Sequence, residues 1–483
     1  MKIRKILSGL LATVLLLSCC ACSAAPQETK NPVTVSAPNL MQSVVKMDST
    51  AQDAERAIDT NLHSSAEFEV GNSITFTFQA PVSINRVALR ERGADCEAFS
   101  LYGEDEQGNR TLLYNNDVID DYLYCAFPET VVSKLVFTVD KTDGDSVDIL
   151  DIAAYCVEPE RDDFRVHAYY PYWGNSALFQ NPENAEKYKQ DLDTVTDMIL
   201  IGNIYWNEYG ELEYDAETLK KEMAAIREMI GERDVRVWTC ILNPRKADGS
   251  IDNSASVKAI NKHLDTLTDN ILALCKEYGF AGVDFDWEYP RQPHNWWAYN
   301  KLLVHVKEKL APENLLLSSA LGPWGNMMSK DAKEALDFVN VMSYDWAKND
   351  RNYHAEFYTC HYFSAEYFLK HGFKREQLVL GVPFYGSRTG EPYAQQIYSA
   401  FEISDKAQNT VIFDGMEYYF NGCNSIYSKT AFNLDNGFAG TMIWSGIFDA
   451  PRDSEYSLFN AMHSAINGEA NEDTADTAEN PAA

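Results

Sequence analysis

Eight short apolar runs, separated by stretches with helical spacing, occupy the chain from about residue 165 to residue 468. The runs cover residues 166–170, 198–204, 235–241, 282–287, 315–321, 338–342, 378–382 and 440–444. The segments between them, such as 216–230 and 300–310, carry many Lys and Glu residues. Strands that alternate with helices form parallel sheets, and eight such units close into a barrel of about 250 residues. The sequence therefore predicts an α/β fold, a (β/α)8 TIM barrel, over 165–468.

A different pattern precedes the barrel segment. Residues 41–157 contain short alternating runs, such as 73–78, 84–89 and 135–139, separated by Gly, Asn and Asp turns. This pattern predicts an all-β sandwich of the jelly-roll kind. The order of its elements resembles discoidin-like (coagulation factor type C-like) domains, on the stretches 57–59, 84–89 with Glu91, and 99–102. Domains of that family often bind carbohydrate, but all nine tryptophans lie between Trp173 and Trp444, so a spacer and a lectin both stay open for 41–157.

The N-terminus has the composition of an export signal. Lys2, Arg4 and Lys5 precede an apolar run over 6–17, which is too short for a stable membrane-spanning helix. Residues 1–18 are therefore predicted to be a signal peptide, followed by a linker over 19–40. Residues 16–19 resemble a bacterial lipobox, which predicts lipid attachment at Cys19 and an extracellular, surface-anchored protein. Ordinary cleavage near Ala25 is the alternative.

Charge and composition exclude several classes of protein. The chain has 41 Lys and Arg against 72 Asp and Glu, a net charge of −31, and a field of that sign repels the phosphates of nucleic acid. A hydrophobic content of 45% with a mean hydropathy of −0.33 excludes a disordered chain and a polytopic membrane protein. The acidic tail over 469–483 is predicted to be disordered. The seven cysteines beyond residue 22 form neither a CxxC pair nor a Cys/His cluster, so no zinc site is indicated. We also expect a monomer.

Three acids recur at every second position in the fourth apolar run. Asp284, Asp286 and Glu288 alternate with bulky apolar residues, so in a strand they share one face, toward the barrel interior. Carboxylates crowded into one interior repel one another, so at least one is expected to hold a proton near neutral pH. That is how an enzyme prepares a general acid. A hard-cation site is the competing interpretation of the same three acids.

These acids carry a specific resemblance. Residues 281–288 match the pattern D-G-x-D-x-D-x-E of glycoside hydrolase family 18, the chitinase family, except that Ala281 replaces its first acid. Further landmarks follow in the order of that family, at 167–173, 341–345, 381–386 and 440–444. The third strand lacks the S-x-G-G pattern common in the family, which leaves the path of the substrate on that side open. The short segment 386–440 predicts no full α+β insertion domain and a shallow groove.

The resemblance implies roles for individual residues. Glu288 would be the general acid and base, with Asp286, Asp284 and Tyr344 completing the catalytic set. Asp345 and Met342 would shape the pocket around the N-acetyl group of the substrate. Trp444 would stack beneath a sugar ring, and Tyr170 and Tyr385 would line the pocket. Other tryptophans near the strand ends are candidates for subsites at the barrel mouth: Trp173, Trp206, Trp324 and Trp346. Trp287 is expected to pack beneath the helices instead.

The resemblance implies a retaining glycosidase that cleaves β-1,4 bonds after N-acetylglucosamine units of chitin, with the acetamide of the substrate as nucleophile and with no metal or cofactor. An endo-β-N-acetylglucosaminidase acting on N-glycan cores shares the same chemistry, and the glycan strands of peptidoglycan are a third substrate. A non-catalytic chitin-binding lectin is the alternative from another class. Retention of Glu288, Asp286, Asp284 and Tyr344 argues against it.

Overall fold

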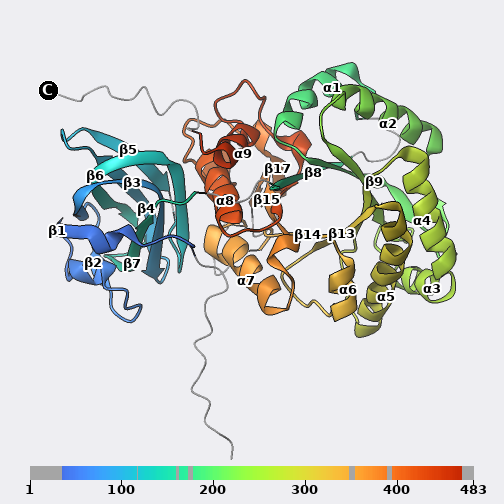
Figure 1. Cartoon of the computed structure of the whole chain (residues 1–483), viewed down its shortest axis with the longest axis horizontal. Coiled ribbons are helices and arrows are strands. Elements are labelled where there is room, and N and C mark those ends of the chain that lie inside the picture. The colour runs from blue at the N-terminus through green and yellow to red at the C-terminus, as the bar shows by residue number, and fades with distance from the viewer. Residues whose placement is uncertain are drawn as a thin grey trace, which may run out of the picture.

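Eight parallel strands close into a barrel in the second part of the chain (Figure 1). They are β8 (Arg165–Pro171), β9 (Asp197–Trp206), β11 (Arg236–Leu242), β12 (Gly282–Asp286), β13 (Leu316–Leu321), β14 (Phe338–Val341), β15 (Leu378–Pro383) and β20 (Gly440–Trp444). The sheet closes because β8 pairs in parallel with both β9 and β20. The short β10 (Leu212–Glu213) adds an antiparallel hairpin to β9. The predicted (β/α)8 TIM barrel is confirmed.

This computed structural model describes residues 35–116, 118–158, 163–171, 178–346, 354–388 and 394–469. The predicted signal peptide, Cys19, Trp173 and the tail beyond residue 469 lie outside the described residues. No helix within the described ranges is long and apolar enough to cross a membrane.

Helix α2 shows how a helix of the barrel begins, ends and buries an apolar stripe. In α2, Asp215 accepts a hydrogen bond from the backbone N–H of Thr218 and so caps the first turn, while Gly231 ends the helix at a φ of 60°. The buried residues of α2 include Leu219, Met223, Ile226 and Ile230, which recur at the period of a helix. The helices are α1 (Pro182–Lys189), α2 (Ala216–Ile230), α3 (Asn253–Lys262), α4 (Leu264–Tyr278), α5 (Pro293–Leu310), α6 (Lys330–Ala335), α7 (Phe363–Lys370), α8 (Cys423–Asp435) and α9 (Leu458–Asn467).

Strand β12 shows the predicted division of its side chains. Phe285 and Trp287 point to the helical layer, where both pack against Tyr299 of α5. The indole N–H of Trp287 donates a 2.7 Å hydrogen bond to Asn253 of α3. Asp284 points the other way, into the barrel, where it is fully buried. The expectation that Trp287 packs beneath the helices is therefore confirmed.

An all-β domain precedes the barrel, as the alternating pattern of 41–157 predicts. Its strands are β1 (Val44–Ser49), β2 (Ala66–Phe68), β3 (Ser73–Arg92), β4 (Cys96–Glu104), β5 (Arg110–Asn116), β6 (Leu123–Thr142) and β7 (Val147–Tyr155). They form one antiparallel sheet in the order β2-β7-β3-β6-β4-β5, with β1 added to β3. The long strands β3 and β6 change register between Thr77 and Val82. Phe68, Phe99 and Phe137 pack ring against ring in its core.

A small antiparallel sheet lies between β15 and α8. It contains β16 (Tyr385–Arg388), β17 (Ala394–Ile397), β18 (Thr410–Phe413) and β19 (Met416–Tyr419), in the order β17-β16-β19-β18. The segment therefore holds a four-stranded sheet rather than the full α+β domain that the sequence argues against. This sheet matters for the site because β17 carries Gln395 to the mouth of the barrel.

Candidate active site

A pocket of about 280 Å³ opens at the carboxyl ends of the barrel strands. The loops and strand ends at this face of a TIM barrel are where side chains from different strands converge. Seven of the residues predicted from the sequence line it: Asp286, Glu288, Trp324, Met342, Tyr344, Asp345 and Trp444. These residues converge on one cavity although they lie in, or follow, four different strands.

The three acids of the fourth strand differ in their exposure to solvent. Asp284 is buried, Asp286 is half-buried and Glu288, beyond the end of β12, is exposed at the pocket. The period of two in a strand puts all three on one side, and the rise along the strand brings them progressively nearer the mouth. The acids therefore form a line from the barrel interior to the pocket.

Asp284 is held by three donors. The hydroxyl of Tyr169 donates to its Oδ2 over 2.8 Å, and Ser318 Oγ and Asn340 Nδ2 donate to its Oδ1 over 2.6 and 3.1 Å. Burial raises the pKa of Asp284 above its ordinary value, although these hydrogen bonds oppose the shift. The carboxyl group is fixed in place and its ionisation is suppressed.

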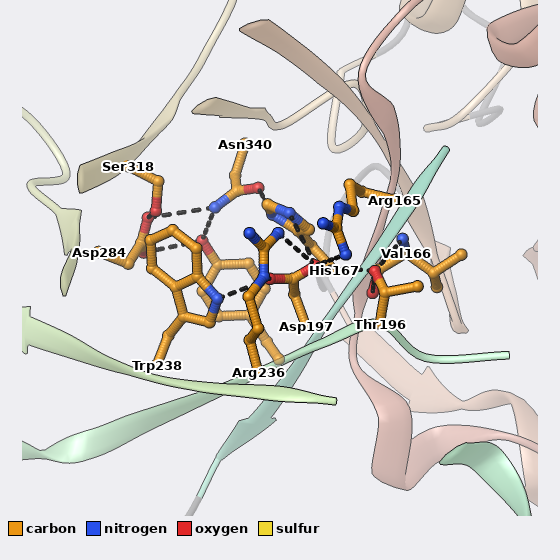
Figure 2. A network of polar contacts seen from close by, with 11 residues as sticks. Arg165, Val166, His167, Thr196, Asp197, Arg236, Trp238, Asp284, Ser318 and Asn340 are labelled. Carbon is orange, nitrogen blue, oxygen red and sulfur yellow. Dashed lines mark hydrogen bonds and ion pairs between the residues drawn. The ribbon is translucent and has the colours of Figure 1, made fainter. Parts of the chain in front are cut away.

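A buried polar network continues from Asp284 toward the opposite end of the barrel (Figure 2). The side-chain oxygen of Asn340 lies 2.8 Å from Nδ1 of His167, and Nε2 of His167 lies 3.6 Å from Asp197. Arg236 and Trp238 donate to Asp197 over 2.6 and 2.7 Å. Burial lowers the pKa of His167, so its imidazole is neutral near pH 7. The network therefore holds Asn340 in place, and the neutral imidazole of His167 adds no positive charge near Asp284.

Among the three acids of the fourth strand, Asp286 has the most strongly perturbed ionisation. Burial raises its pKa well above the ordinary range, and the nearby carboxyl groups of Glu288 and Asp284 raise it further. Its Oδ1 is buried and has no hydrogen-bond partner among the described residues. A buried oxygen without a partner is unusual in a folded protein, and at a pocket wall it is ready to accept a hydrogen bond from a ligand.

Glu288 faces a second acid and a cation. The protein around its carboxyl group raises the pKa, the charge of Asp345 raises it further, and the guanidinium of Arg245 lowers it. A carboxylic acid with a raised pKa keeps its proton nearer to neutral pH, which is the requirement for a general acid. The side chain is also exposed at the pocket, so the proton is accessible to a ligand.

Tyr344 and Asp345 follow β14 and form the wall beside these acids. The hydroxyl of Tyr344 lies 3.8 Å from the sulfur of Met442. Asp345 accepts a 2.6 Å hydrogen bond from Tyr385 and two weaker bonds from Gln395 at 3.3 and 3.4 Å. Tyr385 is therefore buried behind Asp345 and does not itself line the cavity, although the resemblance implies that it does.

The expectation for Tyr170 needs correction. Tyr170 is fully buried on the helical side of β8, where it packs against Phe179 and Tyr188. Its neighbour Tyr169 lines the pocket, with its ring 5.7 Å from that of Trp444. The alternation of side chains along β8 explains the exchange, because His167 and Tyr169 point inward and Tyr170 points outward. The same alternation, counted from His167, was the signal that could have found it.

Of the tryptophans expected at the barrel mouth, some lie at the pocket and one is buried beneath the helices. Trp324 lines the pocket, and Trp346 packs against Trp324 with ring centroids 6.4 Å apart. Trp206 is buried against Phe285 and so is not a subsite residue.

Several pocket residues carry no signal in the sequence. Arg245 follows β11, the strand that lacks the family pattern S-x-G-G. It is the one cation among the described residues of the pocket wall. Tyr289 and Gln395 also contribute to the wall. They lie outside regular periodic segments or on an inserted sheet, so strand alternation does not predict their direction.

One carboxylic acid with a raised pKa, one buried acceptor and one phenol converge on a cavity with an aromatic wall. Among the described residues no group of three or more His, Cys, Asp or Glu side chains has the geometry to hold a metal ion. The arrangement can donate a proton to a ligand atom and hold an amide group through its N–H and its carbonyl oxygen.

Comparisons with known proteins identify the family of the barrel. The family model for glycosyl hydrolases family 18 matches residues 165–449. Endochitinase 1 of Metarhizium robertsii is 24% identical in an alignment 322 positions long, which covers 55% of this chain and 72% of that protein. Probable chitinase 2 of Drosophila melanogaster is 30% identical in an alignment 152 positions long, which covers 28% of this chain and 31% of that protein.

The fold is also that of solved structures. A GH18 chitinase from Cycas revoluta in complex with (GlcNAc)3 superposes with a TM-score of 0.51 at 17% identity, covering 62% of this chain and 99% of that one. The barrel, its acidic pocket and these comparisons define a glycoside hydrolase. The chain belongs to glycosyl hydrolases family 18.

Proposed function

We propose that this protein is an exported glycosidase that hydrolyses β-1,4 linkages of N-acetylglucosamine-containing glycans, chitin and chito-oligosaccharides, by retaining, substrate-assisted catalysis. The observation that carries the proposal is the convergence of Glu288, Asp286 and Tyr344 on one cavity, with the pKa of both carboxyl groups raised. The solved relative from Cycas revoluta binds (GlcNAc)3, which supports a substrate of this class.

The first step breaks the glycosidic bond. Glu288 gives its proton to the glycosidic oxygen as the bond from that oxygen to C1 breaks. At the same time the carbonyl oxygen of the 2-acetamido group of the substrate forms a bond to C1, which gives a cyclic oxazolinium ion. Asp286 accepts the hydrogen bond of the acetamide N–H, and Tyr344 donates to its carbonyl oxygen. Such fixed partners stabilise the charge that develops in the transition state.

The second step restores the enzyme. Water attacks C1, the ring of the oxazolinium opens, and Glu288 takes the proton from that water. Each of the two displacements inverts the configuration at C1, so the product keeps the β configuration. Trp444, beside Tyr169, offers the aromatic face on which a pyranose ring packs through its axial C–H bonds. Asp345 and Met342 shape the wall near the acetamide.

The proposal is tested by incubating the purified protein with chitotetraose, a high-mannose glycopeptide and purified peptidoglycan, and reading the products by mass spectrometry. Cleavage of chitotetraose with β-configured products, seen by NMR before mutarotation, is the expected result. Cleavage of the glycopeptide alone would favour an endo-β-N-acetylglucosaminidase, and cleavage of peptidoglycan alone would favour a cell-wall hydrolase. Binding of chitotetraose without any cleavage would instead indicate a lectin.

The acid itself is tested by a matched pair of variants. Glu288→Gln removes the proton donor but keeps the shape of the side chain, so kcat is expected to fall by about 10³-fold or more. Glu308→Gln, on the exposed face of α5, is the control and leaves kcat unchanged. Full activity of the Glu288→Gln variant would overturn the assignment, and loss of activity on adding a chelator would favour the competing cation site.

Export and anchoring are a separate part of the proposal. They rest on the basic and apolar segment over 1–18 and on Cys19. Metabolic labelling with a palmitate analogue is expected to mark the wild type and not a Cys19→Ala variant. Label that survives the substitution would contradict attachment at Cys19.

A further inference from the structure

The all-β domain packs against the barrel through a buried polar contact on α8. In Figure 1 this domain lies beside α8 and α7. Arg86 of β3 donates to the carboxylate of Asp435, the last residue of α8, over 2.6 Å, and the hydroxyl of Tyr124 donates to the same carboxylate over 2.8 Å. The side chains of Arg86 and Asp435 are 5% and 0% exposed. A charge pair so completely removed from water fixes the orientation of the two groups that carry it.

A second contact joins the all-β domain to the π-helical segment Phe357–Tyr362, which precedes α7. The hydroxyl of Thr359 donates to Oδ2 of Asp120 over 3.1 Å, and both side chains are buried. The ring of Tyr122 packs 4.8 Å from that of Tyr362 and 6.2 Å from that of Phe357. The π-helical segment is therefore held from outside the barrel by the all-β domain.

Ala355, two residues before the π-helical segment, is held by α8. Lys429, buried on α8, donates to the carbonyl oxygen of Ala355 over 2.6 Å and to the side chain of Asn421 over 2.7 Å. Asn421 in turn donates to the same carbonyl oxygen over 3.1 Å. The neighbouring Ser428 accepts a hydrogen bond from the backbone N–H of Ala126 in the all-β domain. Helix α8 thus connects the domain contact to Ala355.

The segment 354–362 contacts the active site through its first residue, His354. Nδ1 of His354 lies 3.2 Å from Oδ1 of Asp345, the pocket acid whose charge raises the pKa of Glu288. The imidazole is fully buried and packs against the rings of Tyr385 and Tyr419. Asp345 has a φ of 67°, in the left-handed region, which a non-glycine residue keeps only where its surroundings hold it.

We propose that the all-β domain is a positioning element of the active site: through Asp120 and Thr359 it fixes the segment 354–362, and through His354 it fixes the carboxylate of Asp345 in the pocket. The inference rests on the proposed function, since it assigns Asp345 to the catalytic pocket. Thr359 and His354 are positioning residues, because they act through Asp345 and do not line the cavity. Catalysis is sensitive to displacements of less than 1 Å, so a segment held at a distance can set the rate.

A set of full-length variants tests the connection. Thr359→Val removes the hydroxyl but keeps the volume, and kcat on chitotetraose is expected to fall about threefold or more with KM little changed. Thr359→Ser keeps the hydroxyl and is expected to restore kcat to within twofold of the wild type. Thr268→Val is the control, because Thr268 is equally buried but bonds only within α4, to the carbonyl oxygen of Asp265.

A double-mutant cycle then separates positioning from general stability. His354→Phe removes the contact with Asp345 and keeps an aromatic ring, and kcat is expected to fall about tenfold. Adding Thr359→Val to His354→Phe should cause no further loss, because both act through the same carboxylate. Additive losses, or equal losses in Thr359→Val and Thr359→Ser, would overturn the proposal.

Hydrogen exchange supplies a readout that does not depend on activity. Backbone amides of 354–362 are expected to exchange faster in Thr359→Val than in the wild type, Thr359→Ser or Thr268→Val. Unchanged exchange in Thr359→Val would overturn the proposal. If the wild type cleaves none of the offered glycans, the proposed function fails, and exchange alone decides whether the all-β domain holds this segment.

Discussion

The hydroxyl of Tyr169 on β8 donates a 2.8 Å hydrogen bond to Oδ2 of Asp284 on β12, and this bond spans the interior of the barrel. Tyr169 also accepts a hydrogen bond from Asn340, so its phenol has a fixed direction. The bond stabilises the ionised form of the innermost acid, in a place where burial favours the neutral form.

Loss of that hydroxyl should impair catalysis. Tyr169→Phe removes one donor from Asp284, which raises the pKa of Asp284 further and alters its charge beside Asp286. We expect kcat on chitotetraose to fall about tenfold. Tyr170→Phe is the matched control, because Tyr170 packs outside the barrel, and its kcat should stay within twofold of the wild type. Equal losses in both variants would contradict the placement of the two tyrosines.

Arg245 should control the alkaline side of the pH profile. Activity requires the protonated form of Glu288, so the rate falls as the pH rises through the raised pKa of that residue. Arg245 lowers this pKa, so Arg245→Met should raise it further and move the falling limb of kcat/KM to higher pH, by about half a unit. Lys246→Met, on the next and exposed residue, should leave the limb in place. A shift toward lower pH in Arg245→Met would refute this role.

Glu91 should make the fold less stable as the pH rises. Burial raises its pKa from 4.5 to about 7, although the backbone N–H groups of Asp95 and Cys96 donate to it. Between these values the folded state binds more protons than the unfolded state, so the free energy of unfolding decreases with pH across that window, by about 3 kcal/mol.

The test is the pH dependence of thermal unfolding. Glu91→Gln has no proton to lose, so its Tm should fall less than that of the wild type between pH 5 and pH 8, as measured by calorimetry. Parallel decreases in the two proteins would show that Glu91 is not the source of the pH dependence.

The domain contact should contribute strongly to stability. Arg86→Met leaves the carboxylate of Asp435 buried without its cation, and the free energy of unfolding should fall by about 3 kcal/mol or more. The double variant Arg86→Met/Asp435→Leu should lose less, because no unpaired charge stays buried. Lys221→Met, which removes an exposed and solvent-screened ion pair on α2, should change the free energy of unfolding far less than Arg86→Met. Urea titration of the three variants measures these differences, and a double variant less stable than Arg86→Met would contradict the explanation.

The parts of this protein that were predictable from sequence are those set by local periodicity. The eight barrel strands and the alternation of Asp284 with Phe285 follow from a period of two, which a strand imposes on neighbouring residues. The motif alone predicts Tyr170 at the pocket. The period of two, counted from His167, places Tyr169 there and turns Tyr170 toward the helices. The descent of the three acids from mouth to interior was implied by the same rule.

The parts that were not predictable depend on long-range packing. Gln395 reaches the pocket from an inserted sheet, and Arg245 from a loop without periodic structure, so no pattern in the chain indicates either. Arg86 and Asp435 are 349 residues apart, and neither belongs to a motif. Contacts of this kind appear only once the two domains are placed side by side.

The junction at α8 has a consequence for domain exchange. Phe432 packs its ring against Tyr124 of the all-β domain, one turn of α8 before the buried Asp435. A barrel separated from its own N-terminal domain would expose this aromatic ring to water and leave an acid without its countercharge. Replacing the N-terminal domain by an unrelated carbohydrate-binding cassette would therefore require new residues on α8, and the two halves of this chain are expected to be inherited together.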